Sequence, residues 1–304
     1  MHLRSNEATL PTLALIAAVV LWGSSFIAMK VAVGAFHPML VVFSRMAIAA
    51  LAFAVFLRRF RADYRPGDWK WIVLMALCEP CLYFVCEAYA LRYTAASQAG
   101  MITAILPLLT AVGARIFLQE RTSLRTYCGF LLSIAGVVWL TGVAATTENA
   151  PDPLLGNFLE FLAMCCATGY MLLLKKLTTR YNSWFLTFMQ ALVGAVFFVP
   201  AMAVTGVSLP AALPLLPALC VVYLGLFISI GAYGFYNFGM SRLPAGQATA
   251  FVNLIPVVTL ILGSLLLGDR FSTQQYLASL LVFLGVFLSQ SRPRKGRQGL
   301  APSA

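Results

Sequence analysis

The sequence predicts an all-α polytopic membrane protein, in which ten transmembrane helices form two inverted five-helix repeats. Composition is the first reason, because 61% of the 304 residues are hydrophobic and only 10% are charged. Soluble domains average about 45–50% apolar and about 25% charged residues. The other two reasons are the apolar runs, each near the roughly 20 residues that a bilayer crossing needs, and an internal repeat.

Ten apolar segments follow one another along the chain with short polar links between them. Each is long enough to cross the hydrocarbon core as a helix that rises about 1.5 Å per residue. The segments are 10–34, 37–58, 68–91, 95–118, 124–143, 154–178, 184–206, 214–239, 245–268 and 273–290. We therefore expect a multi-pass protein whose surroundings are the lipid bilayer.

The basic residues predict the orientation of these helices. Sixteen Lys and Arg residues fall in segments on the same side as the N-terminus, and only Arg92 and Arg270 fall on the other side. Because cytoplasmic loops carry the excess of basic residues, both termini are expected in the cytoplasm and the protein in the inner, or plasma, membrane. The bias also explains the net charge of +11 without a nucleic-acid partner.

Two long stretches of the chain match each other without a gap. "QAGMITAILPLLTAVGARIFLQERTSLRTYCGFLLSIAGV" (98–137) aligns with residues 247–286 at a constant offset of 149, which places proline on proline and tyrosine on tyrosine. Each half then holds five crossings, and an odd number inverts the second half relative to the first. Inverted repeats are typical of secondary transporters, which bind solute near the bilayer midplane. The expected units are residues 1–143 and 154–290, followed by a basic tail, 291–304.

Several motifs resemble the EamA family of the drug/metabolite transporter superfamily. They are "LWGSSFIAMK" (21–30), "FSRMAIAA" (43–50), "EAYALRYTAASQAGMITAILPLLTA" (87–111) and "FLQERTSLRTYCGFLLSIAGV" (117–137). The resemblance covers about residues 10–290. It implies ten helices around a central cavity for small organic solutes, and it implies export of amino acids or related metabolites, with no cofactor.

The segment 68–91 carries two glutamates and a proline where hydrocarbon would surround it. In a regular helix Glu79, Tyr83 and Glu87 follow one another at intervals of four residues, so we expect one polar stripe. An ionised carboxylate at the bilayer centre costs about 2.5–3.5 kcal/mol on insertion scales. The stripe should therefore face the protein interior or a water-filled cavity, where the missing N–H of Pro80 can also be tolerated as a kink or hinge.

Two basic residues, Arg45 and Lys30, fall near the expected depth of Glu87. We expect Glu87 to pair with one of them as a structural clamp. No basic residue falls at the expected depth of Glu79, and burial without a cation favours the neutral form of a carboxyl group. Glu79 is then either a neutral group hydrogen-bonded inside the bundle, or a group that binds a cationic amine or exchanges a proton during transport.

The remaining candidates are polar or aromatic residues within the crossings. Pro107 and Pro256 occupy repeat-related positions and are either fixed kinks or hinges. An aromatic ring can pack the bundle or hold a solute, and a buried amide needs a hydrogen-bond partner. With Glu79, the candidate solute-binding residues are Trp22, Ser24, Tyr83, Gln98, Tyr170, Gln190, Tyr233, Asn237, Gln247 and Asn253.

Together these features predict a carrier that moves small organic metabolites by alternating access, with proton coupling through Glu79 as a hypothesis. An uncoupled facilitative carrier and a channel-like permease are the alternatives. The sequence holds no nucleophile–base pair, no cluster of metal ligands and no phosphate-binding motif, so neither an enzyme nor a metal site is expected.

Overall fold

A computed structural model describes residues 5–55, 65–117, 124–207, 210, 212–243, 248 and 250–289, with the side chains of 5–8 and 289 left aside. The regular structure of these residues is helical, apart from one β-bridge between Thr147 and Ala150 in a loop. The expected tail 291–304 lies outside the described residues.

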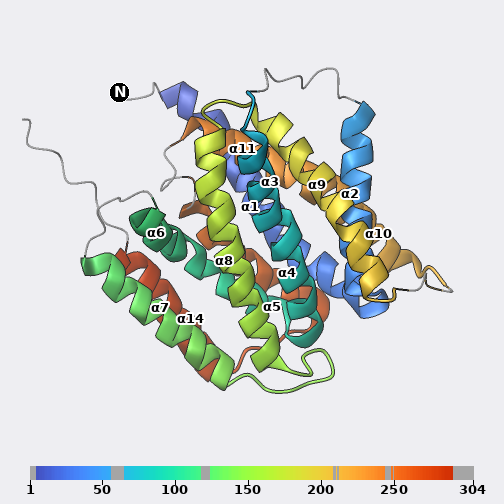
Figure 1. Ribbon diagram of the computed structural model, residues 1–304. Helices are drawn as coiled ribbons and strands as arrows, with labels where there is room; N and C mark the ends of the chain where they lie inside the picture. The colour runs from blue at the N-terminus through green and yellow to red at the C-terminus, as the bar shows by residue number, and fades with distance from the viewer. Residues whose placement is uncertain are drawn as a thin grey trace, which may run out of the picture.

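The first half contains five consecutive apolar helical stretches that are long enough to cross a membrane (Figure 1). The first two are single helices, and the third and fourth are divided by short π or 3-10 segments. Their bounds are α1 (Ser5–Ala35), α2 (Pro38–Val55), α3 (Trp69–Ala76), η2 (Leu77–Leu82), α4 (Tyr83–Tyr93), α5 (Ala96–Ile102), η3 (Thr103–Ile105), α6 (Leu106–Phe117) and α7 (Leu124–Gly142).

The second half repeats this order, including the divided segments. A π segment again interrupts the third stretch, and a 3-10 segment again precedes the α-helix that begins with an apolar residue and a proline in the fourth. The fourth stretch of this half ends in a further π segment, which has no counterpart among the described residues of the first half. The bounds are α8 (Pro153–Leu177), α9 (Ser183–Val204), α10 (Leu215–Tyr223), η4 (Leu224–Ala232), α11 (Tyr233–Arg242), η5 (Phe251–Leu254), α13 (Ile255–Leu262), η6 (Gly263–Leu267) and α14 (Thr273–Ser289).

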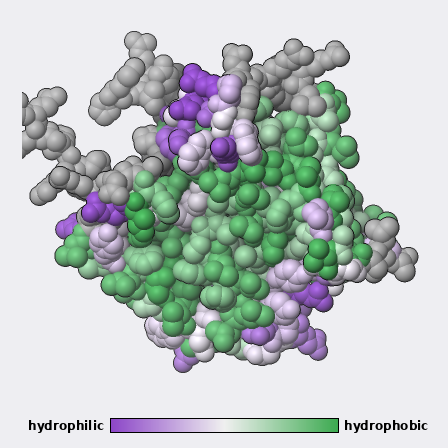
Figure 2. Space-filling view, viewed as in Figure 1, coloured by the Kyte–Doolittle hydropathy of each residue, from purple (hydrophilic) through white to green (hydrophobic). Residues whose placement is uncertain are grey.

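Eight helical stretches among the described residues are long and apolar enough to cross a membrane. Two shorter apolar stretches, Phe251–Leu267 and Thr273–Leu288, follow them in the chain. A broad hydrophobic surface covers the middle of the molecule, with hydrophilic residues at its two ends (Figure 2). The protein is therefore a multi-pass membrane protein, and the count of ten crossings stays a prediction.

The helices run between two ends of the bundle, which we name by a residue in each. At the Asn149 end, Asp269 Oδ2 accepts hydrogen bonds from the backbone N and the hydroxyl of Ser97, at 3.1 and 2.7 Å. At the Arg180 end, Arg180 Nη1 lies 3.1 Å from Asp68 Oδ1. The same carboxylate accepts a hydrogen bond from the Tyr181 hydroxyl at 3.0 Å, which ties the start of α3 to the α8–α9 link.

Helices of the two halves pack in reciprocal pairs. The pairs α2–α9 and α7–α14 each join helices that hold the same position in the two halves. Helices α7 and α14 lie side by side at one edge of the molecule (Figure 1). The pair α4–α8 has its counterpart in α11–α1, with the halves exchanged, and α6–α8 likewise has its counterpart in α1–α13.

Two lysines fasten helix ends in the same manner in each half. Lys30 Nζ donates to the carbonyl oxygens of Leu91 and Thr94 at the end of α4, at 2.6 and 2.8 Å. In the second half, Lys175 Nζ donates to the carbonyls of Met240 and Leu243 at the end of α11, at 2.9 and 3.0 Å. A cation at a helix C-terminus satisfies carbonyls that have no partner within the helix.

Glycines let α7 and α14 approach closely. A Cβ atom added at Gly285 would lie 2.3 Å from Ser133 Oγ and 2.5 Å from the carbonyl oxygen of Gly129. A Cβ added at Gly136, the residue 149 positions earlier, would lie 2.8 Å from the backbone N of Val282. Small residues at such contacts allow helix backbones to pack directly against each other in a bilayer.

Candidate functional site

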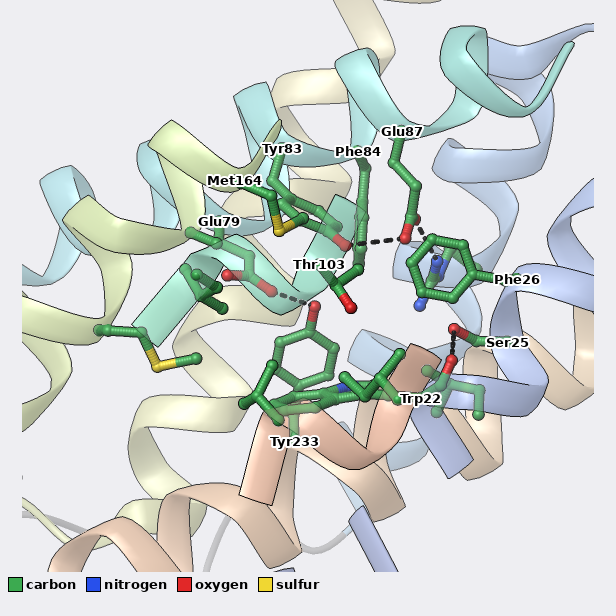
Figure 3. Close-up of a pocket in the computed structure, with 17 residues that line it drawn as sticks. Trp22, Ser25, Phe26, Glu79, Tyr83, Phe84, Glu87, Thr103, Met164 and Tyr233 are labelled. Atoms are coloured by element: carbon green, nitrogen blue, oxygen red, sulfur yellow. Dashed lines mark hydrogen bonds and ion pairs between the residues drawn. The ribbon is translucent and has the colours of Figure 1, made fainter. Parts of the chain in front are cut away.

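A small cavity lies in the interior of the bundle, between helices of both halves (Figure 3). Its volume is about 30 Å³, which holds one or two water molecules. Its polar or charged lining residues are Ser25, Arg45, Glu79, Tyr83, Glu87, Thr103 and Tyr233, and its apolar ones include Trp22, Phe26, Phe84, Leu106, Met164, Ala167, Met171, Ile228, Val252 and Ile255.

Glu79 reaches this cavity from a break in its helix. Its backbone lies at φ −149° and ψ 117°, extended rather than helical, within the π segment that also contains Pro80. The hydroxyl of Tyr233 donates to Glu79 Oε1, and the side-chain amide of Gln190 donates to the Glu79 carbonyl oxygen at 3.1 Å. The expected polar stripe was therefore wrong in its geometry: Glu79 does not share a regular helix with Tyr83 and Glu87.

Glu87 lies across the cavity beside a buried arginine. Arg45 Nη1 is 3.8 Å from Glu87 Oε2, and Oε1 of the same carboxylate accepts a hydrogen bond from the Tyr83 hydroxyl at 2.9 Å. The guanidinium group also donates from Nε to Ser229 Oγ at 3.2 Å and lies 3.9 Å above the ring of Phe84. Arg45 is only 1% exposed, so these contacts replace water almost completely.

Lys30, the other residue expected near Glu87, is not its partner. It lies at the Asn149 end and bonds helix-end carbonyls instead. The clamp in the structure therefore involves Arg45.

Three polar atoms of the cavity lining have no hydrogen-bond partner within the described part of the chain. They are Glu79 Oε2, Arg45 Nη2 and Trp22 Nε1, and each is shielded from solvent. A buried polar atom without a partner costs free energy that a bound ligand can recover. One acceptor and two donors are thus left for a ligand with both an anionic and a cationic group.

A third buried carboxyl group, Glu160 on α8, was not among the expected residues. It is 0% exposed, and neither of its oxygens has a hydrogen-bond partner among the described residues. Glu79 and Glu87 are also buried, at 4% exposed each, and Arg45 is the buried arginine of the described residues. Its sequence neighbours are apolar, but an ionisable residue inside a membrane segment is itself a signal of function, and that signal could have identified it.

Other expected residues form a polar cluster behind the cavity. Tyr170, fully buried, donates its hydroxyl hydrogen to Asn237 Oδ1 at 2.6 Å. The amide of Asn237 in turn donates to Thr187 Oγ1 and to Gln190 Oε1, at 2.8 and 3.3 Å. These side chains satisfy one another and support Tyr233, whose ring packs edge-on against Tyr170. They do not line the cavity.

The remaining expected residues lie elsewhere. Ser24 Oγ bonds the Leu21 carbonyl and the Tyr223 hydroxyl, and its neighbour Ser25 lines the cavity in its place. Gln98 lies toward the Asn149 end, Asn253 is partly buried away from the cavity lining, and Gln247 lies outside the described residues.

The prolines lie at changes of helix type. Pro107 is the second residue of α6, directly after the 3-10 segment η3, and Pro256 is the second residue of α13, directly after η5. A proline in the first turn of a helix removes no intrahelical hydrogen bond. The bends expected at these positions therefore coincide with 3-10 segments, and whether they move stays a prediction.

Comparisons with known proteins agree on one family. The model of the EamA-like transporter family matches residues 9–142 and again 154–290. Over 274 residues the chain is 28% identical to the uncharacterized transporter YcxC of Bacillus subtilis, covering 87% of each protein. It is also 26% identical to a probable terminal-alkyne amino-acid exporter of Streptantibioticus cattleyicolor, covering 92% of this chain and 93% of that protein.

Two further matches differ in coverage. The chain is 26% identical to the uncharacterized transporter YetK of Bacillus subtilis, and this match spans 64% of that protein. A solved crystal structure aligns with a TM-score of 0.64 at 21% identity, covering 92% of this chain and 96% of the other, which shows a common fold. Since the family model matches both halves of the chain, the protein belongs to the EamA-like transporter family.

Proposed function

We propose that the protein is a secondary carrier that exports small amphipathic organic amines, amino acids foremost, by alternating access. The observation that carries this proposal is the pair of unpartnered charged atoms, Glu79 Oε2 and Arg45 Nη2, on one interior cavity. Secondary transporters bind solute at such a central position between their repeats. The curated relative named as an amino-acid exporter supports the same solute class.

The cavity suggests how an amino acid is held. The ammonium group lies against Glu79 Oε2, and the carboxylate accepts hydrogen bonds from Arg45 Nη2. The apolar side chain lies among Trp22, Phe26 and Met164, where an aromatic face also attracts the cationic end. The Tyr233 hydroxyl donates to the other carboxylate oxygen, Oε1, and so orients the carboxylate of Glu79 (Figure 3).

The small volume of the cavity favours a carrier over an open channel. A space of about 30 Å³ holds one or two water molecules and no amino acid. Solute can therefore enter only when the surrounding helices separate.

Alternating access requires different contacts at the two ends of the bundle, and the described residues provide different features at each. Cavities of about 470 and 280 Å³ open at the Asn149 end, around Lys30 and around Gln98 respectively. The Arg180 end carries the Asp68–Arg180 ion pair and the Tyr181 hydrogen bond between the two halves. The positive-inside bias makes the Arg180 end cytoplasmic. In this proposal the ion pair latches the inner end, and the two cavities open toward the outside.

Reciprocal packing supports an inverted repeat as the basis of the motion. The exchanged helix pairs and the matching lysine contacts are the pattern expected of two halves related by a two-fold axis in the membrane plane. If the two halves exchange their conformations, the latched end opens and the open end closes.

The test is solute efflux from liposomes that contain the purified protein. Labelled leucine, phenylalanine, threonine and lysine are loaded in parallel, and efflux and counterflow exchange are followed for wild type and Glu79→Gln. We expect saturable exchange of at least one amino acid, lost in the variant because the ammonium group has no anionic partner. Tyr276→Phe, which alters a tyrosine exposed on α14, is the control for protein handling.

Tyr233→Phe refines the test, because it removes the hydroxyl that orients Glu79 while it keeps the ring. It should weaken exchange less than Glu79→Gln and more than Tyr276→Phe. Flux that does not saturate would favour the channel-like alternative. Saturable efflux that ignores a pH gradient would favour the uncoupled carrier. Exchange that is unchanged in Glu79→Gln would refute the assignment of the solute site.

A further inference from the structure

Glu160 occupies a distinct place between the central cavity and the Asn149 end. On α8 the residues Glu160, Met164, Ala167 and Met171 are spaced at i, i+4, i+7 and i+11, so they lie on one helix face. The last three line the central cavity. Glu160 continues that face one turn nearer the Asn149 end, beyond the cavity wall.

The side chain of Glu160 is enclosed without a cation of its own. It is 0% exposed, and both carboxyl oxygens lack a hydrogen-bond partner among the described residues. Helix α8 packs there against α4, whose Glu87, Tyr83 and Cys86 are the titratable groups that interact electrostatically with it. The contacting segments α5 and η3 contain no titratable residue. The titratable residues of α6 and α7 lie in the parts of these helices nearer the Arg180 end.

The nearby arginine does not compensate this group. Arg45 is already in contact with Glu87, so Glu87 and Glu160 together would place two negative charges against one positive charge. Two close carboxylates in a buried site do not both ionise readily, and a proton on one of them relieves the repulsion. Because Tyr83 donates to Glu87 and Arg45 lies beside it, the ionised member is Glu87 and the proton belongs on Glu160.

Polar groups lie between Glu160 and the Asn149 end, although no hydrogen bond joins Glu160 to them within the described residues. One turn farther along α8, the buried Asn157 donates to Gln98 Oε1 at 3.2 Å and to Thr141 Oγ1 at 3.1 Å. Gln98 in turn lines the cavity of about 280 Å³ at the Asn149 end. Buried amides and hydroxyls of this kind can hold the water molecules that carry protons.

We propose that Glu160 is a proton-binding site of the transport cycle, loaded from the Asn149 end and separate from the solute-binding Glu79. This inference rests on the proposed carrier function. At the outer side, hydronium transfers a proton to the Glu160 carboxylate. An O–H bond forms on the carboxyl group, and the hydronium becomes a water molecule. After the halves exchange conformations, the carboxyl group returns the proton to water on the cytoplasmic side.

The charge balance of the cavity explains how this proton is coupled to solute. A cationic amine bound at Glu79 and a proton on Glu160 both reduce the net negative charge of the same buried carboxylates. Each therefore weakens the binding of the other, which is the condition for exchange of a proton for an outgoing amine.

The first experiment compares Glu160→Gln, Glu160→Asp and Glu79→Gln in liposomes loaded with the same labelled amino acids. In Glu160→Gln we expect counterflow exchange to survive while the stimulation of efflux by external acid is lost. Glu160→Asp should retain the stimulation, and Glu79→Gln should lose exchange itself. Stimulation of Glu160→Gln equal to that of wild type would overturn the proposal. So would loss of exchange together with stimulation, since Glu160 would then belong to the solute site.

A second measurement is independent of any transported solute. Infrared difference spectra between acidic and neutral pH record the C=O stretch of protonated carboxyl groups. We expect a band in wild type that disappears in Glu160→Gln and shifts in Glu160→Asp. If the Gln variant does not fold, the shift in the Asp variant provides the test. An identical band in all three proteins would refute the proton site. Absence of transport with the band present would instead contradict the carrier function alone.

Discussion

Removal of the buried arginine offers a quantitative test of the central cluster. In Arg45→Met, Glu87 keeps its hydrogen bond from Tyr83 but loses the cation 3.8 Å away. Ser229 still donates to the Leu224 carbonyl oxygen at 3.0 Å, so the uncompensated carboxylate dominates the cost. Breaking a buried ion pair from one side costs about 3–5 kcal/mol, and loss of a desolvated cation–π contact with Phe84 adds up to about 2 kcal/mol.

The double variant Arg45→Met/Glu87→Gln should recover most of this loss. A glutamine can accept the same hydrogen bond from Tyr83 and carries no charge, and replacing both members of a buried pair is often nearly neutral. At about 2 °C per kcal/mol for a chain of this size, the single variant should unfold roughly 6–14 °C below wild type. The double variant should unfold within about 4 °C of wild type.

A thiol-reactive dye can follow this unfolding in detergent, because all seven cysteines are free and Cys81 is buried. The fluorescence rises as heat exposes the thiols. A single variant as stable as wild type would show that Arg45 does not compensate Glu87. A double variant no more stable than the single one would show that the lost packing of the guanidinium, not the unpaired charge, is what destabilises the protein.

Three further changes test other parts of the structure. Gly285→Ala places a methyl group 2.3 Å from Ser133 Oγ, so the α7–α14 pair must separate, and the same thermal assay should show a loss of about 1–3 kcal/mol. Asp68→Asn weakens the latch to Arg180, whose side chain is 42% exposed, so stability should change little. Amide hydrogen exchange in the first turn of α3 should nevertheless accelerate, and unchanged exchange would exclude a latch. Partial burial and the charge of Arg92 lower the pKa of His37. Its neutral form is thus favoured in the folded protein, and stability is lost as pH falls below the unfolded value near 6.5. His37→Asn should lose less stability than wild type between pH 7 and 5.

The sequence was sufficient for the helical membrane architecture and the family. Long apolar runs can form little else in a bilayer, and the motifs around Arg45 and Gln98 identify the family that the comparisons confirm. The depth argument also selected Arg45, Glu79 and Glu87, which the structure brings to one cavity. The ten crossings and the inverted repeat remain predictions.

The details of the site depend on information that periodicity does not contain. A regular helix was assumed through Glu79, whereas its backbone is extended there, so the direction of its side chain could not follow from spacing. Tyr170 and Asn237 were expected in the cavity, but they satisfy each other behind it. Which face of a crossing meets the solute depends on neighbours distant in sequence. Glu160 could have been identified from the sequence, because an ionisable residue within a membrane segment indicates a functional site. It was missed because its sequence neighbours are apolar.

The excess of buried carboxylates also determines how the carrier would respond to membrane voltage. If one proton enters for each zwitterionic amino acid that leaves, the cycle moves one positive charge inward. A potential of 100 mV, negative inside, then contributes about 2.3 kcal/mol per cycle, which sustains a roughly fiftyfold concentration ratio at about 1.4 kcal/mol per factor of ten. A cationic solute such as lysine would leave with a charge equal to that of the entering proton. Its export would then respond to pH and be insensitive to voltage.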